Sequence, residues 1–201
     1  MARLLNRNFI LGITGSIAAY KAAELTRDLI REGANVRVVM TEGACEFITP
    51  LTRQALSGHD VHMDLLDTDA EAAMGHIELA RWADVMLIAP ASADSIARLV
   101  QGRANDLLGA CVLATPAPLF IAPAMNQEMW AKKATQDNIK VLNDRGATVL
   151  GPSSGSQACG DVGAGRLLEP VLIVEAITET LGTGLLAGRH VVITAGPTRE
   201  I

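Results

Sequence analysis

The sequence has few aromatic residues, few cysteines and no cluster of basic residues. Aromatic residues make up 3% of the 201 positions and the formal net charge is -5, so the chain lacks the basic, stacking surface typical of nucleic-acid-binding proteins. No apolar run approaches the length of about 20 residues that a membrane-spanning helix needs. The cysteines, Cys45, Cys111 and Cys159, are odd in number and widely spaced, unlike a disulfide framework or a paired-cysteine metal site. We therefore expect a cytoplasmic protein without metal that binds neither nucleic acid nor membrane.

Short apolar runs, often β-branched, alternate with helical patterns along the chain. Hydrophobic residues make up 49% of the sequence, enough for one buried core. The alternation is typical of repeated βαβ units, and continuous runs such as VMLIAP suit a parallel sheet buried on both faces. We predict strands at 9–14, 35–41, 84–90, 118–122 and 147–151, and helices at 17–31, 43–57, 91–102, 131–144 and 170–181. The expected fold is a three-layer, doubly wound parallel α/β sheet, flavodoxin-like or Rossmann-like.

In such a sheet, ligands bind outside the carboxyl ends of the strands, so the residues that follow each predicted strand are the candidates. The first strand is followed by a glycine turn that opens a helix, as a phosphate site requires. The second ends in a hydroxyl residue, where a dinucleotide fold usually places an acid for the ribose. These candidates are Gly15, Ser16, Ile17, Ala18 and Thr41. Close packing of helix and strand is the alternative explanation of the glycine turn.

The third and fourth predicted strands each end in proline, a small residue and then polar groups. Small residues let a flat ligand approach the backbone, and the amide of Asn126 can donate hydrogen bonds to a carboxylate. As alternatives, Asn126 could cap the following helix and Met125 could belong to the core. These candidates are Ser92, Ala93, Asp94, Ser95, Ala124, Met125 and Asn126.

Two further candidates lie away from these strand ends. Cys159 lies in the segment 151–166, which has five glycines and no apolar run, so we expect an exposed thiol on a long loop without secondary structure. An unreactive loop thiol is the alternative. His76 begins the helical pattern before the third strand, and a helix N-terminus favours the neutral imidazole that a base requires. A surface or capping histidine is the alternative there.

Five motifs occur in consistent order: GSIAAYK, GHIELARWAD, APASADSIA, PAMNQEMW and GSQACGD. From about residue 9 to residue 170 the chain resembles the flavin-containing cysteine decarboxylases, and within them the branch that acts on phosphopantothenoylcysteine. The resemblance implies that FMN binds to the strand-end candidates and that the substrate contacts Met125, Asn126, Ala158 and Cys159. It implies catalytic roles for His76, Asn126 and Cys159. It also implies a homotrimer, four of which form a dodecamer, with flavin at the subunit contacts.

The implied reaction is FMN-dependent decarboxylation of 4'-phosphopantothenoylcysteine to 4'-phosphopantetheine in coenzyme A biosynthesis. Loss of carbon dioxide leaves a carbanion, which oxidation of the thiol carbon to a thioaldehyde can delocalise. Asn126 would hold the carboxylate, His76 would assist from across a subunit boundary, and Cys159 would return a proton from a flap hinged by glycines. Two alternatives remain: a peptidyl-cysteine decarboxylase that stops at the enethiol, and a flavodoxin-like FMN-binding electron carrier or regulatory protein.

The last residues, 188–201, resemble the opening of a phosphopantothenate-cysteine ligase domain, with the sequence VVITAGPTRE. We therefore expect residues 1–187 to form the FMN-dependent cysteine decarboxylase domain and 188–201 to be the start of a truncated ligase domain. No ligase activity is expected from this chain.

Overall fold

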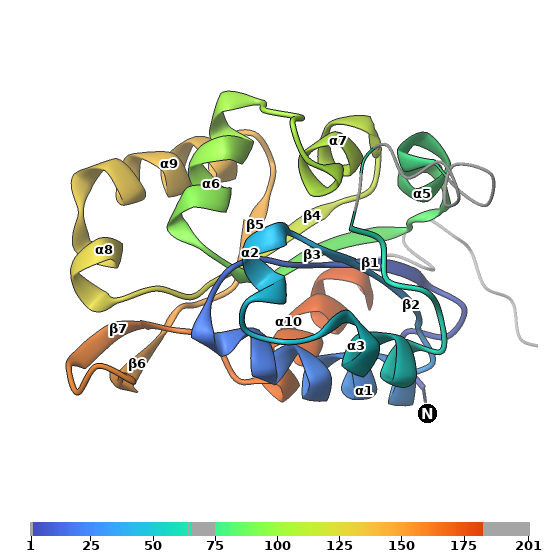
Figure 1. Ribbon diagram of the computed structural model, residues 1–201, viewed down its shortest axis with the longest axis horizontal. Helices are drawn as coiled ribbons and strands as arrows, with labels where there is room; N and C mark the ends of the chain where they lie inside the picture. Colours follow the sequence, from blue (N-terminus) through green and yellow to red (C-terminus); the bar gives the residue numbers. More distant parts are fainter. Residues whose placement is uncertain (1, 64, 66–74, 183–201) are drawn as a thin grey trace, which may run out of the picture.

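The computed structural model, which describes residues 2–63, 65 and 75–182, contains a five-stranded parallel sheet between two layers of helices (Figure 1). The strand order is β2-β1-β3-β4-β5, and every neighbouring pair is parallel. This order confirms the flavodoxin-like prediction. The expected ligase segment 188–201 lies outside the described residues. The strands are β1 (Asn8–Ile13), β2 (Asn35–Met40), β3 (Val85–Ala91), β4 (Leu119–Pro123) and β5 (Thr148–Val149).

Helices cover both faces of the sheet (Figure 1). One layer consists of α1 (Ala22–Arg31), α3 (Pro50–Ser57) and α10 (Pro170–Gly182). The opposite layer consists of α5 (His76–Trp82), α6 (Ala93–Gln101), α7 (Leu107–Ala114) and α9 (Lys133–Asp144). Among the described residues, no helix combines the length and the apolar composition that crossing a membrane requires.

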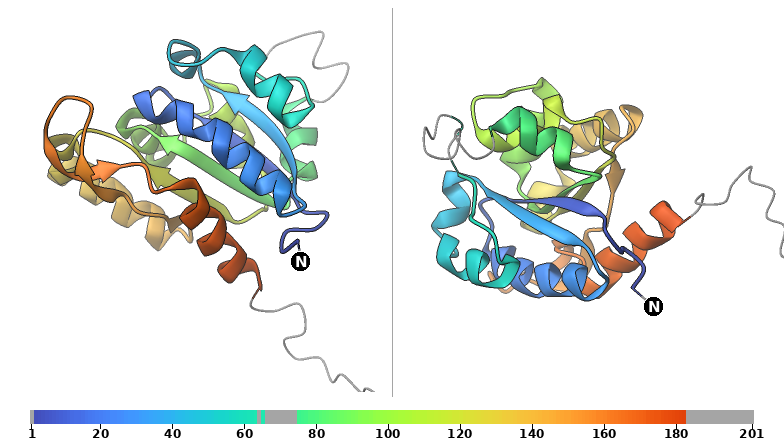
Figure 2. Two further views of the ribbon diagram at one scale, coloured as in Figure 1. Left: turned by 90° about the horizontal axis from the view of Figure 1, so that it is seen from below. Right: turned by 90° about the vertical axis from the view of Figure 1, so that its right-hand side faces the viewer.

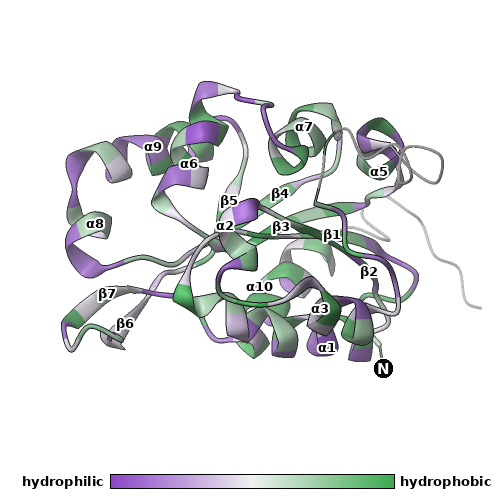
Figure 3. Ribbon diagram, viewed as in Figure 1, coloured by the Kyte–Doolittle hydropathy of each residue, from purple (hydrophilic) through white to green (hydrophobic). Residues whose placement is uncertain are grey.

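The sheet is buried on both faces because successive strand residues point to opposite sides. In β1, Phe9 and Leu11 pack with α1 and α10, whereas Ile10 packs with α5, α6, α7 and α9. All three side chains are fully buried. Figure 3 shows the resulting continuous apolar colour along β1 and β3. This two-sided burial explains why the strands read as uninterrupted apolar runs.

Two predicted helices are divided in the structure. The predicted helix 17–31 begins as a 3-10 turn, η1 (Ile17–Lys21), and continues as α1. The predicted helix 43–57 is split into α2 (Glu42–Cys45) and α3, which starts at Pro50. Proline cannot donate a backbone hydrogen bond inside a helix and forces the preceding residue out of helical geometry, so Pro50 fits only at the start of α3.

The segment 151–166 is a β-hairpin, not the expected loop without secondary structure. Its strands β6 (Ser153–Ser156) and β7 (Val162–Arg166) are antiparallel. The hairpin lies beside α8 (Gln127–Ala131) and projects beyond the sheet (Figure 2). A Cβ at Gly163 would collide with Gln127, and one at Gly165 would collide with the carbonyl oxygen of Met125. Gly163 and Gly165 therefore permit close docking of β7, a packing role that the expectation of a glycine hinge did not include.

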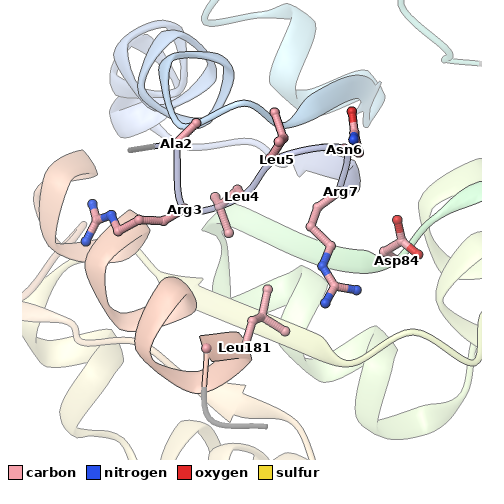
Figure 4. A pocket seen from close by; sticks show the side chains of 9 residues that line it. Ala2, Arg3, Leu4, Leu5, Asn6, Arg7, Asp84 and Leu181 are labelled. Atoms are coloured by element: carbon pink, nitrogen blue, oxygen red, sulfur yellow. The ribbon is translucent and has the colours of Figure 1, made fainter. Parts of the chain in front are cut away.

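A cavity of about 420 Å³ lies at the amino-terminal end of β1 (Figure 4). It is lined by residues of the N-terminal segment, by Asp84 before β3 and by Leu181 near the end of α10. An ion pair of 2.9 Å between Arg3 and Glu32 holds this N-terminal segment. Hydrogen bonds from Arg3 lower the pKa of Glu32 to about 2. None of the predicted site residues lines this cavity.

Candidate active site at the carboxyl ends of the strands

Backbone hydrogen bonds bring the carboxyl ends of four strands side by side. Thr41 N donates to Ile13 O at 3.0 Å, Thr14 N donates to Pro90 O at 3.2 Å, and Ala124 N donates to Ala91 O at 3.0 Å. The segments that follow β1, β2, β3 and β4 therefore meet at one edge of the sheet. All ten residues predicted to bind the cofactor lie on these segments.

The glycine turn after β1 packs tightly against the start of α2. A Cβ at Gly15 would lie 3.1 Å from Gly43 O, which is tighter than most Cβ contacts, so glycine lets the two backbones approach without a shift. Ser16 caps the 3-10 turn, its hydroxyl oxygen accepting from Ala18 N at 3.2 Å. Close packing of backbone segments, the alternative explanation of the glycine turn, therefore accounts for Gly15.

The segment after β3 presents two hydroxyl groups at the start of α6. Ser92 caps this helix, its oxygen accepting from Ser95 N at 3.2 Å, and the two hydroxyl oxygens lie 3.0 Å apart. Asp94 forms an ion pair of 2.8 Å with Arg98 on the same helix, so its charge is already paired. The positive end of the nine-residue α6 and these hydroxyls suit an anionic group.

Thr14 is a site residue that the sequence reasoning did not assign. Its side chain is fully buried, donating to Pro90 O at 2.8 Å and accepting from Ser92 N at 2.8 Å. This one hydroxyl links the end of β1 to the loop that opens α6. The available signal was a hydroxyl residue directly after an apolar strand, just before the glycine turn.

Asn126 and Cys159 are brought into direct contact by docking of the hairpin on α8. Asn126 Nδ2 lies 3.4 Å from Cys159 Sγ and donates to Asp161 Oδ2 at 3.0 Å. Cys159 Sγ donates to the same Asp161 oxygen at 3.3 Å. Asn126 also caps α8, since its Oδ1 accepts from Glu128 N at 2.8 Å. Its capping and functional interpretations are therefore compatible, because they use different atoms of the same amide.

Gln157 fastens the hairpin to the start of α8. Its Oε1 accepts from Gln127 N at 3.1 Å and from Asn126 Nδ2 at 3.4 Å, and its Nε2 donates to Ala164 O at 3.4 Å. A backbone bond of 2.9 Å from Met125 N to Gly165 O adds to this contact. Sequence reasoning assigned no role to Gln157 or Asp161, although both lie within the motif GSQACGD. Ala158, predicted to contact substrate, is exposed next to Cys159.

The three thiols differ in accessibility. Cys159 is exposed, Cys45 is partly buried and Cys111 is buried. Burial raises the pKa of Cys111 to about 12 and also raises that of Cys45. Only Cys159 therefore presents its thiol both to solvent and to an amide donor. Within residues 2–63, 65 and 75–182, no group of three metal-ligating side chains is assembled.

His76 is not brought to this cluster within one chain. It begins α5, as predicted, and is half-buried. Its carbonyl oxygen lies 3.8 Å from Cys111 Sγ of α7. Figures 1 and 2 place α5 and the hairpin at opposite ends of the molecule. Any joint action of His76 with Asn126 and Cys159 therefore requires a second copy of the chain.

The chain is similar to known proteins over almost its whole length. The family model "Flavoprotein" matches residues 2–182. The coenzyme A biosynthesis bifunctional proteins CoaBC of Vibrio cholerae and Escherichia coli are 57% and 54% identical over 100% and 98% of this chain. The chain spans about half the length of these relatives, 50% and 49% respectively.

Solved structures agree with the family match. A cysteine-to-serine mutant of PPC decarboxylase, complexed with pantothenoylaminoethenethiol, has a TM-score of 0.77 and 32% identity, covering 89% of this chain and 100% of that one. The FMN binding protein AtHal3 has a TM-score of 0.76 and 33% identity, covering 89% and 98%. The chain belongs to the flavoprotein family and, within it, to the PPC decarboxylases.

Proposed function

We propose that this chain catalyses FMN-dependent decarboxylation of 4'-phosphopantothenoylcysteine to 4'-phosphopantetheine. The observation that carries the proposal is the 3.4 Å contact between the Asn126 amide and the Cys159 thiol at the carboxyl edge of the sheet. The reaction needs a donor for the substrate carboxylate and an acid for the final proton, and these two side chains supply both. The 32% identical PPC decarboxylase and the bifunctional coenzyme A proteins support this substrate.

We assign FMN to the edge formed by the ends of β1, β2, β3 and β4. The serine hydroxyls and the positive end of α6 suit its phosphate, and the small side chains leave the backbone open to a flat ring. The apolar side chain of Ile17, 62% exposed, offers a surface for that ring. The residues therefore fit the group. The assigned set is Gly15, Ser16, Ile17, Ala18, Thr41, Ser92, Ala93, Asp94, Ser95 and Ala124.

When bound, FMN would supply reversible two-electron redox chemistry at the carbon that bears the substrate thiol. Asn126 orients the substrate carboxylate through its Nδ2 hydrogens, with Met125 and Ala158 beside it. After carbon dioxide has left, Cys159 Sγ donates its proton to the carbon that carried the carboxylate. The hairpin holds Cys159 beside Asn126, so the proposed proton donor and the proposed carboxylate-binding amide act next to each other.

A direct assay tests this function. The purified chain supplied with FMN should bind it and should release carbon dioxide from 4'-phosphopantothenoylcysteine, with 4'-phosphopantetheine detected by mass spectrometry. Flavin binding without carbon dioxide release would favour an electron carrier or a regulatory protein. Turnover of peptides with a C-terminal cysteine, but not of the phosphorylated substrate, would favour a peptidyl-cysteine decarboxylase.

The distance between His76 and the hairpin leads us to place the complete site between subunits, in a homotrimer and in a dodecamer of four trimers. Large apolar side chains near the carboxyl edge are exposed, among them Ile17 (62%), Tyr20 (61%) and Phe47 (49%). A surface of this kind is more typical of a protein contact than of a side chain in free solvent. In this arrangement His76 of one copy assists the oxidation and decarboxylation steps at the Asn126 and Cys159 of its neighbour.

Mixed oligomers provide the test of the shared site. His76→Asn and Asn126→Asp chains should each be inactive alone, but their co-assembly should restore up to about a quarter of the wild-type rate. That fraction of sites in a randomly mixed cyclic oligomer receives His76 from one copy and Asn126 from the other. Carbon dioxide release after co-expression measures it. Failure of verified mixed oligomers to regain activity would contradict the shared site.

A further inference from the structure

Asp161 occupies the hydrogen-bond donor that the proposed function assigns to the substrate. Its Oδ2 accepts from Asn126 Nδ2 at 3.0 Å, the shortest of the three contacts made by that nitrogen. The bound group is a carboxylate, which is also the group that the substrate must present to the same amide. Nδ2 carries two hydrogens, and its other contacts, at 3.4 Å, are with Gln157 Oε1 and Cys159 Sγ. Because no hydrogen of this nitrogen is left without a partner, the substrate carboxylate competes with Asp161 for Nδ2.

The side chain of Asp161 is not needed to close the hairpin turn. The turn is closed by the backbone, with Gln157 N donating to Asp161 O at 2.8 Å and Gly160 N donating to Gln157 O at 2.9 Å. Both hydrogen bonds to its carboxylate come from proposed catalytic side chains, Asn126 at 3.0 Å and Cys159 at 3.3 Å. The carboxylate therefore acts on the site, while the backbone of the same residue shapes the turn.

From these contacts we infer that Asp161 is an internal stand-in for the substrate carboxylate and tunes the affinity of the site for carboxylate-bearing ligands. It is a positioning residue, and this role rests on the proposed function. Before substrate binds, Asp161 satisfies Asn126 Nδ2. The entering carboxylate displaces it, which leaves Asp161 bonded to the Cys159 thiol. When the carboxylate leaves as carbon dioxide, Asp161 returns to Asn126, so the amide keeps an anionic acceptor through the cycle.

This exchange lowers the apparent affinity for substrate. The substrate binds only to sites in which Asp161 has left Asn126, so its apparent affinity is reduced in proportion to the fraction of such sites. Two carboxylates near one amide also repel each other. A ligand without a carboxylate does not need to displace Asp161. The inference therefore predicts that neutralising Asp161 affects carboxylate ligands selectively.

The test compares two competitive inhibitors of the FMN-loaded, full-length chain. One is 4'-phosphopantothenoylalanine, which has the carboxylate but no thiol, and the other is 4'-phosphopantetheine, which has the thiol but no carboxylate. In Asp161→Asn, the inhibition constant of the first should fall about three- to tenfold, as expected for removal of a competing charge-assisted hydrogen bond that is exposed to solvent. The inhibition constant of the second should stay within about twofold.

Glu128→Gln is the matched control. It removes a carboxylate two residues from Asn126. The hydrogen bond between Glu128 and Asn126 is donated by the backbone N of Glu128, so the substitution leaves it in place. Neither inhibition constant should change in this variant. If Asp161→Asn leaves the alanine analogue unchanged or weakens it, or shifts both inhibitors together, the inference is wrong. If the wild-type chain turns over no substrate, both the proposed function and this inference are wrong. If the wild type is active, the inhibition constants of Asp161→Asn test the inference alone.

Discussion

Replacing Cys159 with serine should separate loss of carbon dioxide from formation of the reduced product. The hydroxyl of serine is a much weaker acid than a thiol, so proton return should slow at least about 100-fold, within the range for a lost general acid. Carbon dioxide release should persist, because it precedes the proton transfer. In a single turnover, mass spectrometry should therefore detect the enethiol, which is lighter than 4'-phosphopantetheine by two hydrogen atoms.

The Cys45→Ser variant is the control for this experiment. Cys45 lies at the end of α2 with its Sγ 3.7 Å from Met63 Sδ, and it is not among the contacts of Asn126 Nδ2. Its replacement should leave the product as 4'-phosphopantetheine. An unchanged yield of reduced product from Cys159→Ser would contradict the assignment of the proton donor.

Asn126→Asp should reduce kcat/KM for carbon dioxide release at least about 100-fold, since it removes a hydrogen bond to a charged group and adds a like charge. Aspartate caps helices as well as asparagine does, so the bond to Glu128 N can persist and α8 should stay intact. Thermal unfolding measures that integrity, and steady-state kinetics measure the loss. The substitution therefore distinguishes a substrate-binding amide from a mere helix cap.

Asn126→Ser refines this comparison. Serine also caps the helix but has no amide donor and no charge. Its kcat/KM should lie between those of the wild type and Asn126→Asp. Equal kcat/KM values for wild type and the serine variant would show that the amide does not bind the substrate carboxylate.

The fold could be predicted from the sequence because its main signals are local. Alternating apolar runs and helical patterns predicted the parallel sheet, whereas the strand order was expected from the fold class and not from local patterns. Pro50 was the signal that the prediction passed over at α3. The hairpin was missed because its strands are built from serine and glycine, without the alternation of apolar residues that marks a strand. Its pairing depends on docking against α8, a contact between segments about 30 residues apart.

The sequence indicated which residues belong to the candidate site, but not which of them contact one another. Strand ends located Ser92, Asn126 and their neighbours, since ligands collect at that edge of a parallel sheet. The roles of Thr14, Gln157 and Asp161 were not visible, because each depends on a hydrogen-bond partner far away in the chain. The separation of His76 from the hairpin was likewise invisible in sequence, where the motifs give order but no distance.

The close docking of β7 has a consequence for how the hairpin can change through evolution. Gly163 and Gly165 face the start of α8, where one added carbon atom would collide with the backbone of Met125 at Gly165 and with the side chain of Gln127 at Gly163. Val162, at the outer end of the same strand, is 72% exposed. Tolerance to substitution should therefore alternate along β7, because the positions that face α8 are restricted and the positions that face away from it are free to vary. Sequence drift can remodel the outer surface of the hairpin while its distance from Asn126 stays fixed.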